Sequence, residues 1–312
     1  MNKILLVIAL AIGIIVISCD DKKGKNVENI ENSIEIVHAL DTVLVPVQPK
    51  KVVVFDIGAM ETLNELGVTP VGIPAEFIPE HLKFLKDDKS ITDVGSMMEP
   101  NFEKIYATQP DLIVISARSE KFYKQLSEIA PTIFTQVDNK DYVTSFEKNN
   151  LMLGKIFGQE EKVQKRINDL KATINASKNE ISKSDKKALI ILYNKGKFSA
   201  YGKNSRFGFI HDVMGVKPSD ETLEVATHGQ PISNEFIETA NPDYLFILDR
   251  AAVVNGIKTN KNEIENALIK RTNAYKNNNI IYLNPQIWYL SGGGLTSTEQ
   301  MINDIKQAIL KK

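Results

Sequence analysis

Arginine is rare in this sequence, and three of its arginines follow segments with the pattern of buried strands. The chain has five arginines against 33 lysines, and Arg118, Arg206 and Arg250 each come after a predicted strand. The guanidinium group has a permanent charge and a rigid fork of donors, so it binds a planar or delocalised anion more specifically than an ammonium does. A surface salt bridge is the simpler explanation for any one of them. Three together indicate an anion-binding cleft.

A histidine and a tyrosine in two later loops could supply metal ligands. His228 lies in a turn-like segment, and Tyr289 follows the only tryptophan, Trp288, shortly before the glycines at 292–294. A phenolate oxygen is a hard ligand and an imidazole nitrogen an intermediate one, so the pair suits Fe(III) whose other positions are filled by a chelator. The glycines would let the backbone come close to a bulky ligand. A solvated loop histidine is the simpler alternative for His228.

Composition and motifs argue against several classes of protein. The 312 residues include 38 basic and 39 acidic side chains, a net charge of -1, which gives no electrostatic attraction for nucleic acid. The sequence lacks the motifs of P-loop nucleotide-binding proteins, zinc proteases, serine hydrolases and dinucleotide-binding folds. Its four histidines have no zinc-type spacing. We therefore expect a binding protein and not an enzyme of a common class.

Apolar runs of strand length alternate with helical patterns along most of the chain. Strands buried on both faces and alternating with helices form mostly parallel sheets. Segments 101–118 and 233–250 are alike: a glutamate, a Pro-Asp pair and a final arginine recur at an offset of 132 residues (233 minus 101). Such a repeat predicts two similar lobes.

One long helix is predicted between the repeats. Residues 159–182 contain no proline or glycine, and their apolar residues recur with helical spacing. At about 1.5 Å per residue this helix spans roughly 36 Å, enough for a strut between lobes. The predicted fold is α/β, with two Rossmann-like lobes, 38–158 and 183–312, each with a mostly parallel sheet, joined by this single helix. Thr296 and Glu299 have the spacing of a capping box for the last helix.

The first 37 residues form a separate region. Residues 1–19 have the pattern of a lipoprotein signal peptide, with a basic residue, an apolar run over 4–17 and then Cys19, the only cysteine of the chain. Cys19 would carry the lipid; an uncleaved anchor or an incidental cysteine is the alternative. Residues 20–37 are mostly polar, as expected of a flexible tether. We expect a protein anchored by lipid to the cell membrane, facing the periplasm or the cell exterior.

These features together resemble those of ferric-siderophore-binding lipoproteins of ABC importers, which have the class III periplasmic-binding-protein fold. Among them the sequence is most similar to the enterochelin-type proteins, which take catecholate siderophores, and the resemblance extends from residue 52 to the end. It implies that the three arginines neutralise an anionic ferric catecholate. It also implies that the histidine and the tyrosine ligate the iron when the siderophore offers only four oxygens. The implied ligand-binding residues are Arg118, Arg206, His228, Arg250, Trp288 and Tyr289.

The same resemblance implies how the protein would meet its partners. An acidic residue on each lobe, Glu103 and Glu235, would dock onto the permease dimer of the importer, which works with an ATPase. The alternative is that both glutamates are simply favoured at helix N-termini by the helix dipole. The ferric siderophore is carried and released, so no permanent cofactor is expected. We also expect a monomer.

Three other functions remain as alternatives from the sequence. The same fold could bind haem, cobalamin or a hydroxamate siderophore, although a neutral hydroxamate complex would gain less from three arginines. A surface metallohydrolase that uses His228 is less favoured, because a ligand cluster is missing. A purely adhesive or structural lipoprotein would need no cleft chemistry. Binding of ferric chelates separates these possibilities.

Overall fold

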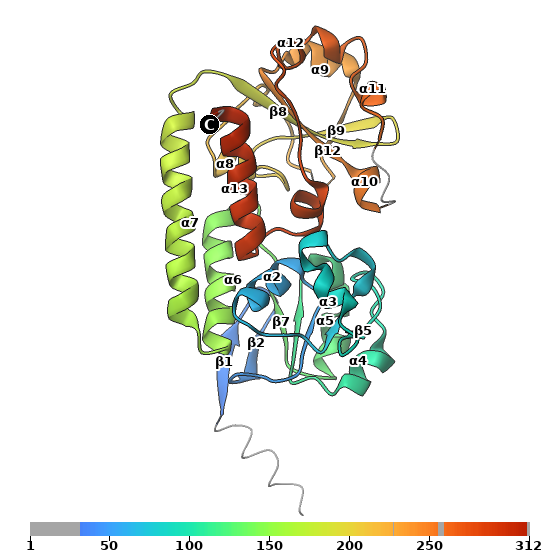
Figure 1. Ribbon diagram of the computed structural model, residues 1–312, viewed down its shortest axis with the longest axis vertical. Helices are drawn as coiled ribbons and strands as arrows, with labels where there is room; N and C mark the ends of the chain where they lie inside the picture. Colours follow the sequence, from blue (N-terminus) through green and yellow to red (C-terminus); the bar gives the residue numbers. More distant parts are fainter. Residues whose placement is uncertain (1–31, 227, 255–258, 311–312) are drawn as a thin grey trace, which may run out of the picture.

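The computed structural model describes residues 32–226, 228–254 and 259–310, and these form two lobes connected by one long helix (Figure 1). The predicted signal peptide with Cys19 and most of the predicted tether lie outside the described residues. Among the residues that are described, no helix is long and apolar enough to cross a membrane.

The folded part of the chain begins earlier than the sequence predicted. Ser33–Val37 forms β1 and pairs antiparallel with β2, Thr42–Pro46. Ile36 and Val45 of this hairpin are buried, so one face of it packs onto the core. The last five residues of the predicted tether therefore belong to a strand.

The N-terminal lobe is built around a parallel sheet, as predicted. Its strand order is β5-β4-β3-β6-β7, and each neighbouring pair is parallel. The carboxyl ends of these strands meet at one edge, where open α/β sheets bind ligands. The elements of this lobe are β3 (Val52–Val54), α2 (Ile57–Glu65), β4 (Gly72–Ile73), α3 (Lys83–Asp87), β5 (Thr92–Asp93), α4 (Phe102–Thr108), β6 (Leu112–Ile115), α5 (Tyr123–Ser127), β7 (Thr132–Phe134) and α6 (Tyr142–Ile156).

The C-terminal lobe has a mixed sheet. Its strand order is β11-β9-β8-β12-β13, with β10 beside β8. The pairs β8–β12, β12–β13 and β8–β10 are parallel, whereas β9 is antiparallel to both β8 and β11. The elements are β8 (Lys187–Asn194), β9 (Lys197–Tyr201), α8 (Phe209–Asp212), β10 (Lys217–Pro218), β11 (Gln230–Ile232), α9 (Asn234–Ala240), β12 (Tyr244–Asp249), α10 (Arg250–Val254), α11 (Lys261–Ile264), α12 (Asn273–Lys276), β13 (Ile280–Tyr282) and α13 (Leu295–Leu310).

A tight hairpin explains why this second sheet is not all parallel. Lys195 and Gly196 connect β8 to β9 and have φ angles of 50° and 83°. Two-residue turns with both φ angles positive match the twist of adjacent antiparallel strands. The Lys-Gly pair between the two apolar segments is the sequence signal for this turn.

The two repeats form matching units. In each, a short helix (α4 or α9) ends at a residue with a left-handed backbone, and an Asp directly precedes the following strand. Asp111 accepts the Lys51 N–H at 3.0 Å, and Asp243 accepts the Lys187 N–H at 2.9 Å. Each aspartate thus ties the repeat strand to the start of its central neighbour, which is why the Pro-Asp pair recurs.

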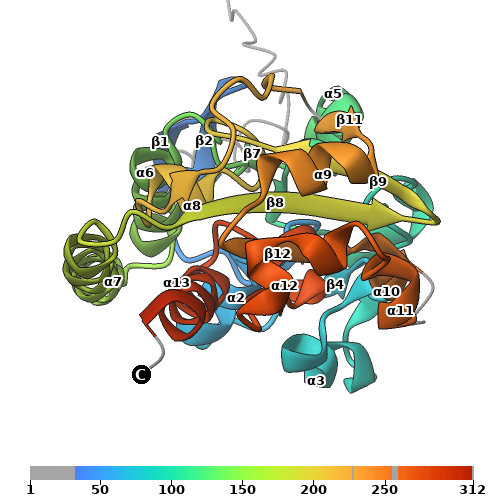
Figure 2. The same ribbon diagram turned by 90° about the horizontal axis from the view of Figure 1, so that it is seen from above.

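The helix predicted over 159–182 is α7, Glu160–Ile181. Seen from above, it lies at one side of the molecule, where it packs against α6 and α13 (Figure 2). Val163, Ile167, Leu170 and Ile174 are buried, so one apolar stripe faces these helices.

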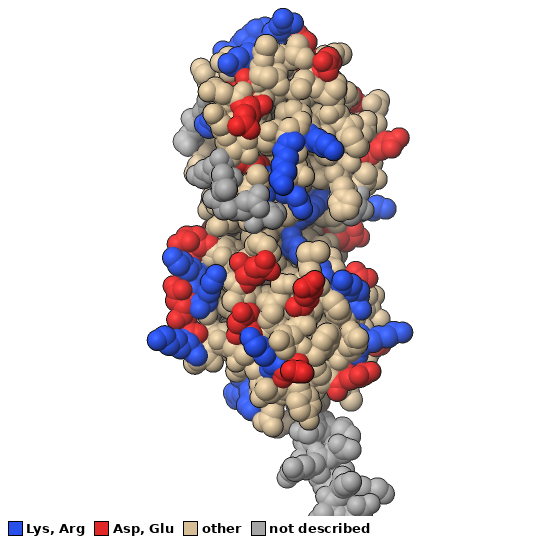
Figure 3. All heavy atoms as spheres, turned by 90° about the vertical axis from the view of Figure 1, so that its right-hand side faces the viewer, with Lys and Arg blue, Asp and Glu red and all other residues tan. Residues whose placement is uncertain are grey.

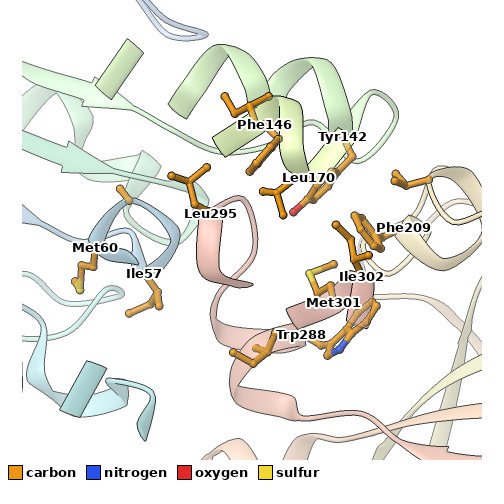
Figure 4. Close-up of a cluster of buried hydrophobic side chains, with 14 of the residues drawn as sticks. Ile57, Met60, Tyr142, Phe146, Leu170, Phe209, Trp288, Leu295, Met301 and Ile302 are labelled. Atoms are coloured by element: carbon orange, nitrogen blue, oxygen red, sulfur yellow. The ribbon is translucent and has the colours of Figure 1, made fainter. Parts of the chain in front are cut away.

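The last helix, α13, connects the two lobes a second time. It follows the C-terminal sheet in sequence but packs against α2 of the N-terminal lobe as well as α7. Figure 4 shows side chains of α2, α6, α7, α8 and α13 meeting in one buried cluster, to which Trp288 also belongs. The lobes therefore share a continuous apolar core on the side of α7.

Candidate ligand-binding cleft

A cleft of about 600 Å³ lies between the lobes and is lined by residues of both. The N-terminal lobe contributes Arg118 and Lys140, and the C-terminal lobe contributes Arg206, His228 and Tyr289. Basic side chains gather at the waist between the lobes in Figure 3. The structure thus brings together Arg118 and Tyr289, which are 171 positions apart in the sequence.

Tyr289 lies on a single π-helical turn, Gln286–Leu290, where the sequence predicted a loop. The wide turn is closed by the Ser291 N–H, which donates to the Gln286 carbonyl at 3.1 Å, five residues back. Such turns are rare and frequent at functional sites. Here the turn sends the Tyr289 ring into the cleft while Trp288 points into the core.

Three arginines converge on Tyr289. Arg118 and Arg206 each donate to its carbonyl oxygen at 2.7 Å, one from each lobe. The guanidinium carbon of Arg206 also lies 4.1 Å from the centre of the tyrosine ring. Arg250, the first residue of α10, donates from Nε to the phenolic oxygen at 3.2 Å. All three predicted arginines are therefore at one site.

None of these three arginines forms an ion pair with a carboxylate of the described residues, whereas the other two arginines do. Arg166 pairs with Glu65 and Glu299, and Arg271 pairs with Glu238. A half-buried guanidinium without a carboxylate leaves positive charge available to an anion. Among the described residues, the simpler explanation of a surface salt bridge therefore does not apply to Arg118 and Arg206, which line the cleft, or to Arg250, which contacts it through Tyr289.

The arginines change the acidity of the site. Burial opposes ionisation of Tyr289, but the hydrogen bond from Arg250 and the charges of Arg206 and Arg250 outweigh it and lower the pKa of Tyr289. Burial lowers the pKa of Arg118, and repulsion by Arg206 lowers it further. The charges thus favour a phenolate at Tyr289, the form that binds a metal.

His228 lines the same cleft as Tyr289 and is exposed. Among the residues that the structure describes, no group of three or more His, Cys, Asp or Glu side chains could hold a metal ion. The two predicted iron ligands therefore line one cleft and are not part of such a cluster.

The glycines after Tyr289 have different roles from the predicted one. Only Gly292 has open space where a side chain would be. A Cβ on Gly293 would lie 2.7 Å from Val137, and Gly294 lies against the backbone of Gly58 in α2. Gly293 and Gly294 therefore allow the C-terminal segment to approach the N-terminal lobe closely. Gly292 alone of the three has the free space that was predicted for a ligand.

Trp288 contributes mainly to the core. It is 4% exposed, packs edge-on against Phe209 and donates its indole N–H to Asp304 of α13 at 2.8 Å. It borders the cleft with little surface. Its role is to fix the turn that carries the neighbouring tyrosine.

The N-terminal wall of the cleft contains two residues that were not predicted from the sequence. Asp56 lies two residues after the end of β3, Thr135 directly follows β7, and both line the cleft. Burial raises the pKa of Asp56 to about 6, against hydrogen bonds from the Thr135 hydroxyl and the Gly58 N–H. The rule that ligands bind at the carboxyl ends of parallel strands could have found both residues.

Glu103 and Glu235 occupy equivalent places in the repeats, away from the residues that line the cleft. Each is an exposed residue in the first turn of its helix, α4 or α9. In α9 the backbone N–H of Glu235 and the Ser233 hydroxyl lower the pKa of the Glu235 carboxyl. Both glutamates are available to a partner.

The fold and the cleft define a substrate-binding protein with two lobes, and the chain belongs to the periplasmic binding protein family, whose model matches residues 52–287. It is similar to the petrobactin-binding protein YclQ of Bacillus subtilis, with 42% identity over 98% of both chains. The crystal structure of YclQ matches with a TM-score of 0.87 and covers 90% of this chain and 99% of YclQ.

Two further relatives come from Vibrio species. The ferric-anguibactin-binding protein FatB of Vibrio anguillarum is 33% identical over 92% of this chain and 91% of its own. The crystal structure of VctP, a periplasmic catecholate-siderophore binding protein of Vibrio cholerae, has a TM-score of 0.84 at 34% identity and covers 88% of this chain and 99% of VctP. The family and the fold class predicted from the sequence are confirmed.

Removing the positive charge beside Tyr289 should raise its pKa. A difference titration of tyrosine absorbance between the wild type and Tyr289→Phe should show one phenol that ionises below the ordinary value of about 10. In Arg250→Gln this phenol should titrate at higher pH, because a hydrogen bond and a charge that favour the phenolate are lost. Arg271→Gln, whose arginine pairs with Glu238, is the matched control. An unchanged titration in Arg250→Gln would contradict this electrostatic account.

Proposed function

We propose that this protein captures an anionic ferric siderophore of the catecholate type outside the cytoplasm and delivers it to the permease of an ABC importer. The observation that carries the proposal is the convergence of three arginines, unpaired with any described carboxylate, on one cleft tyrosine. Ferric catecholates carry delocalised negative charge, which guanidinium groups bind well. The iron arrives and leaves with its chelator as transported ligand.

The chemistry of the cleft favours a siderophore that leaves part of the iron coordination sphere open. Fe(III) prefers oxygen ligands and accepts imidazole, and a siderophore with four donor oxygens leaves two positions free. Tyr289 and His228 face the same cleft and supply these two kinds of donor. A siderophore with six donor oxygens would bind through the arginines alone.

The relatives support this ligand class. Those named above bind petrobactin, ferric anguibactin and a catecholate siderophore according to their names. The family is one of substrate-binding proteins, and we assign no catalytic step to this chain. Lipid attachment at Cys19 and a monomeric state complete the proposal, because the tether would keep the body near the membrane and leave both lobes free for the permease.

Titration with a ferric bis-catecholate tests the ligand assignment. The chain from residue 20 onward, which keeps β1 intact, should show saturable quenching of Trp288 fluorescence. Tyr289→Phe should weaken binding by at least about tenfold, or about 1.4 kcal/mol, and shift the charge-transfer band, because an iron–phenolate bond is lost. His228→Ala should weaken binding as well.

A hexadentate ferric tris-catecholate is the matched ligand control for this titration. Its affinity should change little in both variants, because its iron needs no protein ligand. If no ferric catecholate bound, the ligand assignment would be wrong, and haem, cobalamin and ferric hydroxamates would be tested next.

Substitution of the two repeat glutamates tests delivery to the permease. Glu103→Ala and Glu235→Ala should leave the affinity for ferric chelate unchanged, because both lie away from the cleft lining. Combined, they should slow uptake of radioactive iron by cells that depend on this protein, by about tenfold, since docking charges control association. Glu161→Ala removes an exposed first-turn glutamate of α7 and is the matched control. Normal uptake by the double variant would contradict the docking role.

A further inference from the structure

Glu61 is a buried acidic residue. It lies on α2 of the N-terminal lobe and is 1% exposed. A buried carboxylate is costly unless charges or hydrogen bonds compensate for it. Hydrophobic packing therefore does not explain why a glutamate lies at this position. The groups that contact its carboxylate do.

The two oxygens of Glu61 contact different parts of the molecule. Oε1 lies 2.8 Å from Nε2 of His81, a residue of the same lobe. Oε2 accepts the Ser297 N–H at 2.8 Å, in the first turn of α13. A carboxylate at a helix N-terminus interacts favourably with the positive end of the helix dipole. Glu61, on the N-terminal lobe, thus caps the N-terminus of α13, the last helix of the chain.

This cap replaces the one that the sequence predicted. Thr296 donates its hydroxyl to Glu65 of α2, and Glu299 pairs with Arg166 of α7. The two side chains of the predicted capping box therefore bind other residues and not each other's backbone N–H groups. The start of α13 is capped by the N-terminal lobe and not by its own sequence.

The segment between Tyr289 and Ser297 is held by the same lobe. The Gly293 N–H donates to the Tyr142 hydroxyl at 3.1 Å, and the Gly293 carbonyl accepts from Asn150 at 2.9 Å. A Cβ on Gly294 would collide with Glu61 and with the Gly58 backbone. The main chain from the turn of Tyr289 to α13 therefore has little freedom, and Glu61 is its anionic anchor.

We propose that Glu61 is a positioning residue for Tyr289: by capping α13 from the N-terminal lobe, it sets where the tyrosine oxygen meets the iron of a bound ferric siderophore. This inference rests on the proposed function. Glu61 touches neither the cleft nor the iron, and it acts through eight residues of main chain that are fixed at both ends. Displacement of α13 by the loss of this cap moves the tyrosine relative to the arginines.

A positioning role predicts an effect that depends on the siderophore. Glu61→Ala should weaken binding of the tetradentate ferric bis-catecholate about tenfold and shift its charge-transfer band, because the phenolate no longer meets the iron at the right place. Glu61→Gln keeps an acceptor for the Ser297 N–H, so its affinity and its charge-transfer band should be close to those of the wild type. Binding of the hexadentate ferric tris-catecholate should change by less than about twofold. A merely structural role would weaken both chelates alike and leave the band of the bound complex unchanged.

Two more variants make the test independent of how well Glu61→Ala folds. Gly294→Ala pushes a methyl group against Glu61 from the opposite side and should give the same selective loss and band shift. Glu65→Gln removes a charge one turn further along α2, where the glutamate contacts the Thr296 side chain but caps no N–H of α13. It should bind both chelates normally.

The outcomes separate this inference from the proposed function. If Tyr289→Phe leaves the charge-transfer band unchanged, the tyrosine is not an iron ligand and the proposed function fails in that respect. If Tyr289→Phe shifts the band but Glu61→Ala and Gly294→Ala do not, the positioning role is wrong while the ligand assignment stands. An effect of Glu65→Gln equal to that of Glu61→Ala would also overturn it, because general loosening of α2 against α13 would then explain both.

Discussion

The structure depends on holding three guanidinium groups around one tyrosine without a carboxylate between them. Like charges repel, and burial removes water that would screen them, as the lowered pKa of Arg118 reflects. The fold compensates with neutral acceptors: the Tyr289 carbonyl binds two of the arginines and its hydroxyl binds the third. The positive charges of the three arginines therefore have no carboxylate partner among the described residues and are available to an anionic ligand.

The arrangement requires both lobes to be fixed relative to the turn that carries Tyr289. Arg118 reaches the turn from the N-terminal lobe, and Arg206 and Arg250 reach it from the C-terminal lobe. Three features limit the relative movement of the lobes: the helix α7, the apolar core beside it, and the packing of α13 against α2. A small adjustment of the cleft is compatible with these contacts, whereas a wide hinge opening would break the buried cap on α13.

Features that depend on local sequence were predictable, and features that depend on long-range contact were not. The strut was visible because its apolar spacing is periodic. Arg118 and Arg250 were visible because they end the repeated segments, and Arg206 because it follows another predicted strand. The turn at Tyr289 was not, because its geometry comes from Trp288 packing into the core and from hydrogen bonds with the other lobe. The same holds for the cap by Glu61, since its carboxylate lies 236 residues from Ser297.

The three glycines at 292–294 show most clearly what cannot be predicted from the sequence alone. A run of three glycines near a tyrosine suggested space for a ligand, yet two of them serve close approach of the lobes. Sequence indicates that a side chain is excluded at these positions, but the partner that excludes it is known only from the fold. Similarly, Asp56 and Thr135 lie just after β3 and β7, and their place in the cleft depends on the order of the strands in the sheet.

The most direct measurement of the central claim is X-ray absorption spectroscopy of iron in the complex with a ferric bis-catecholate. The account predicts six-coordinate iron with one short phenolate oxygen and one imidazole nitrogen from the protein, the oxygen being lost in Tyr289→Phe. An iron shell identical in the two proteins would show that the arginines hold the chelate without help from the tyrosine, and would contradict the account.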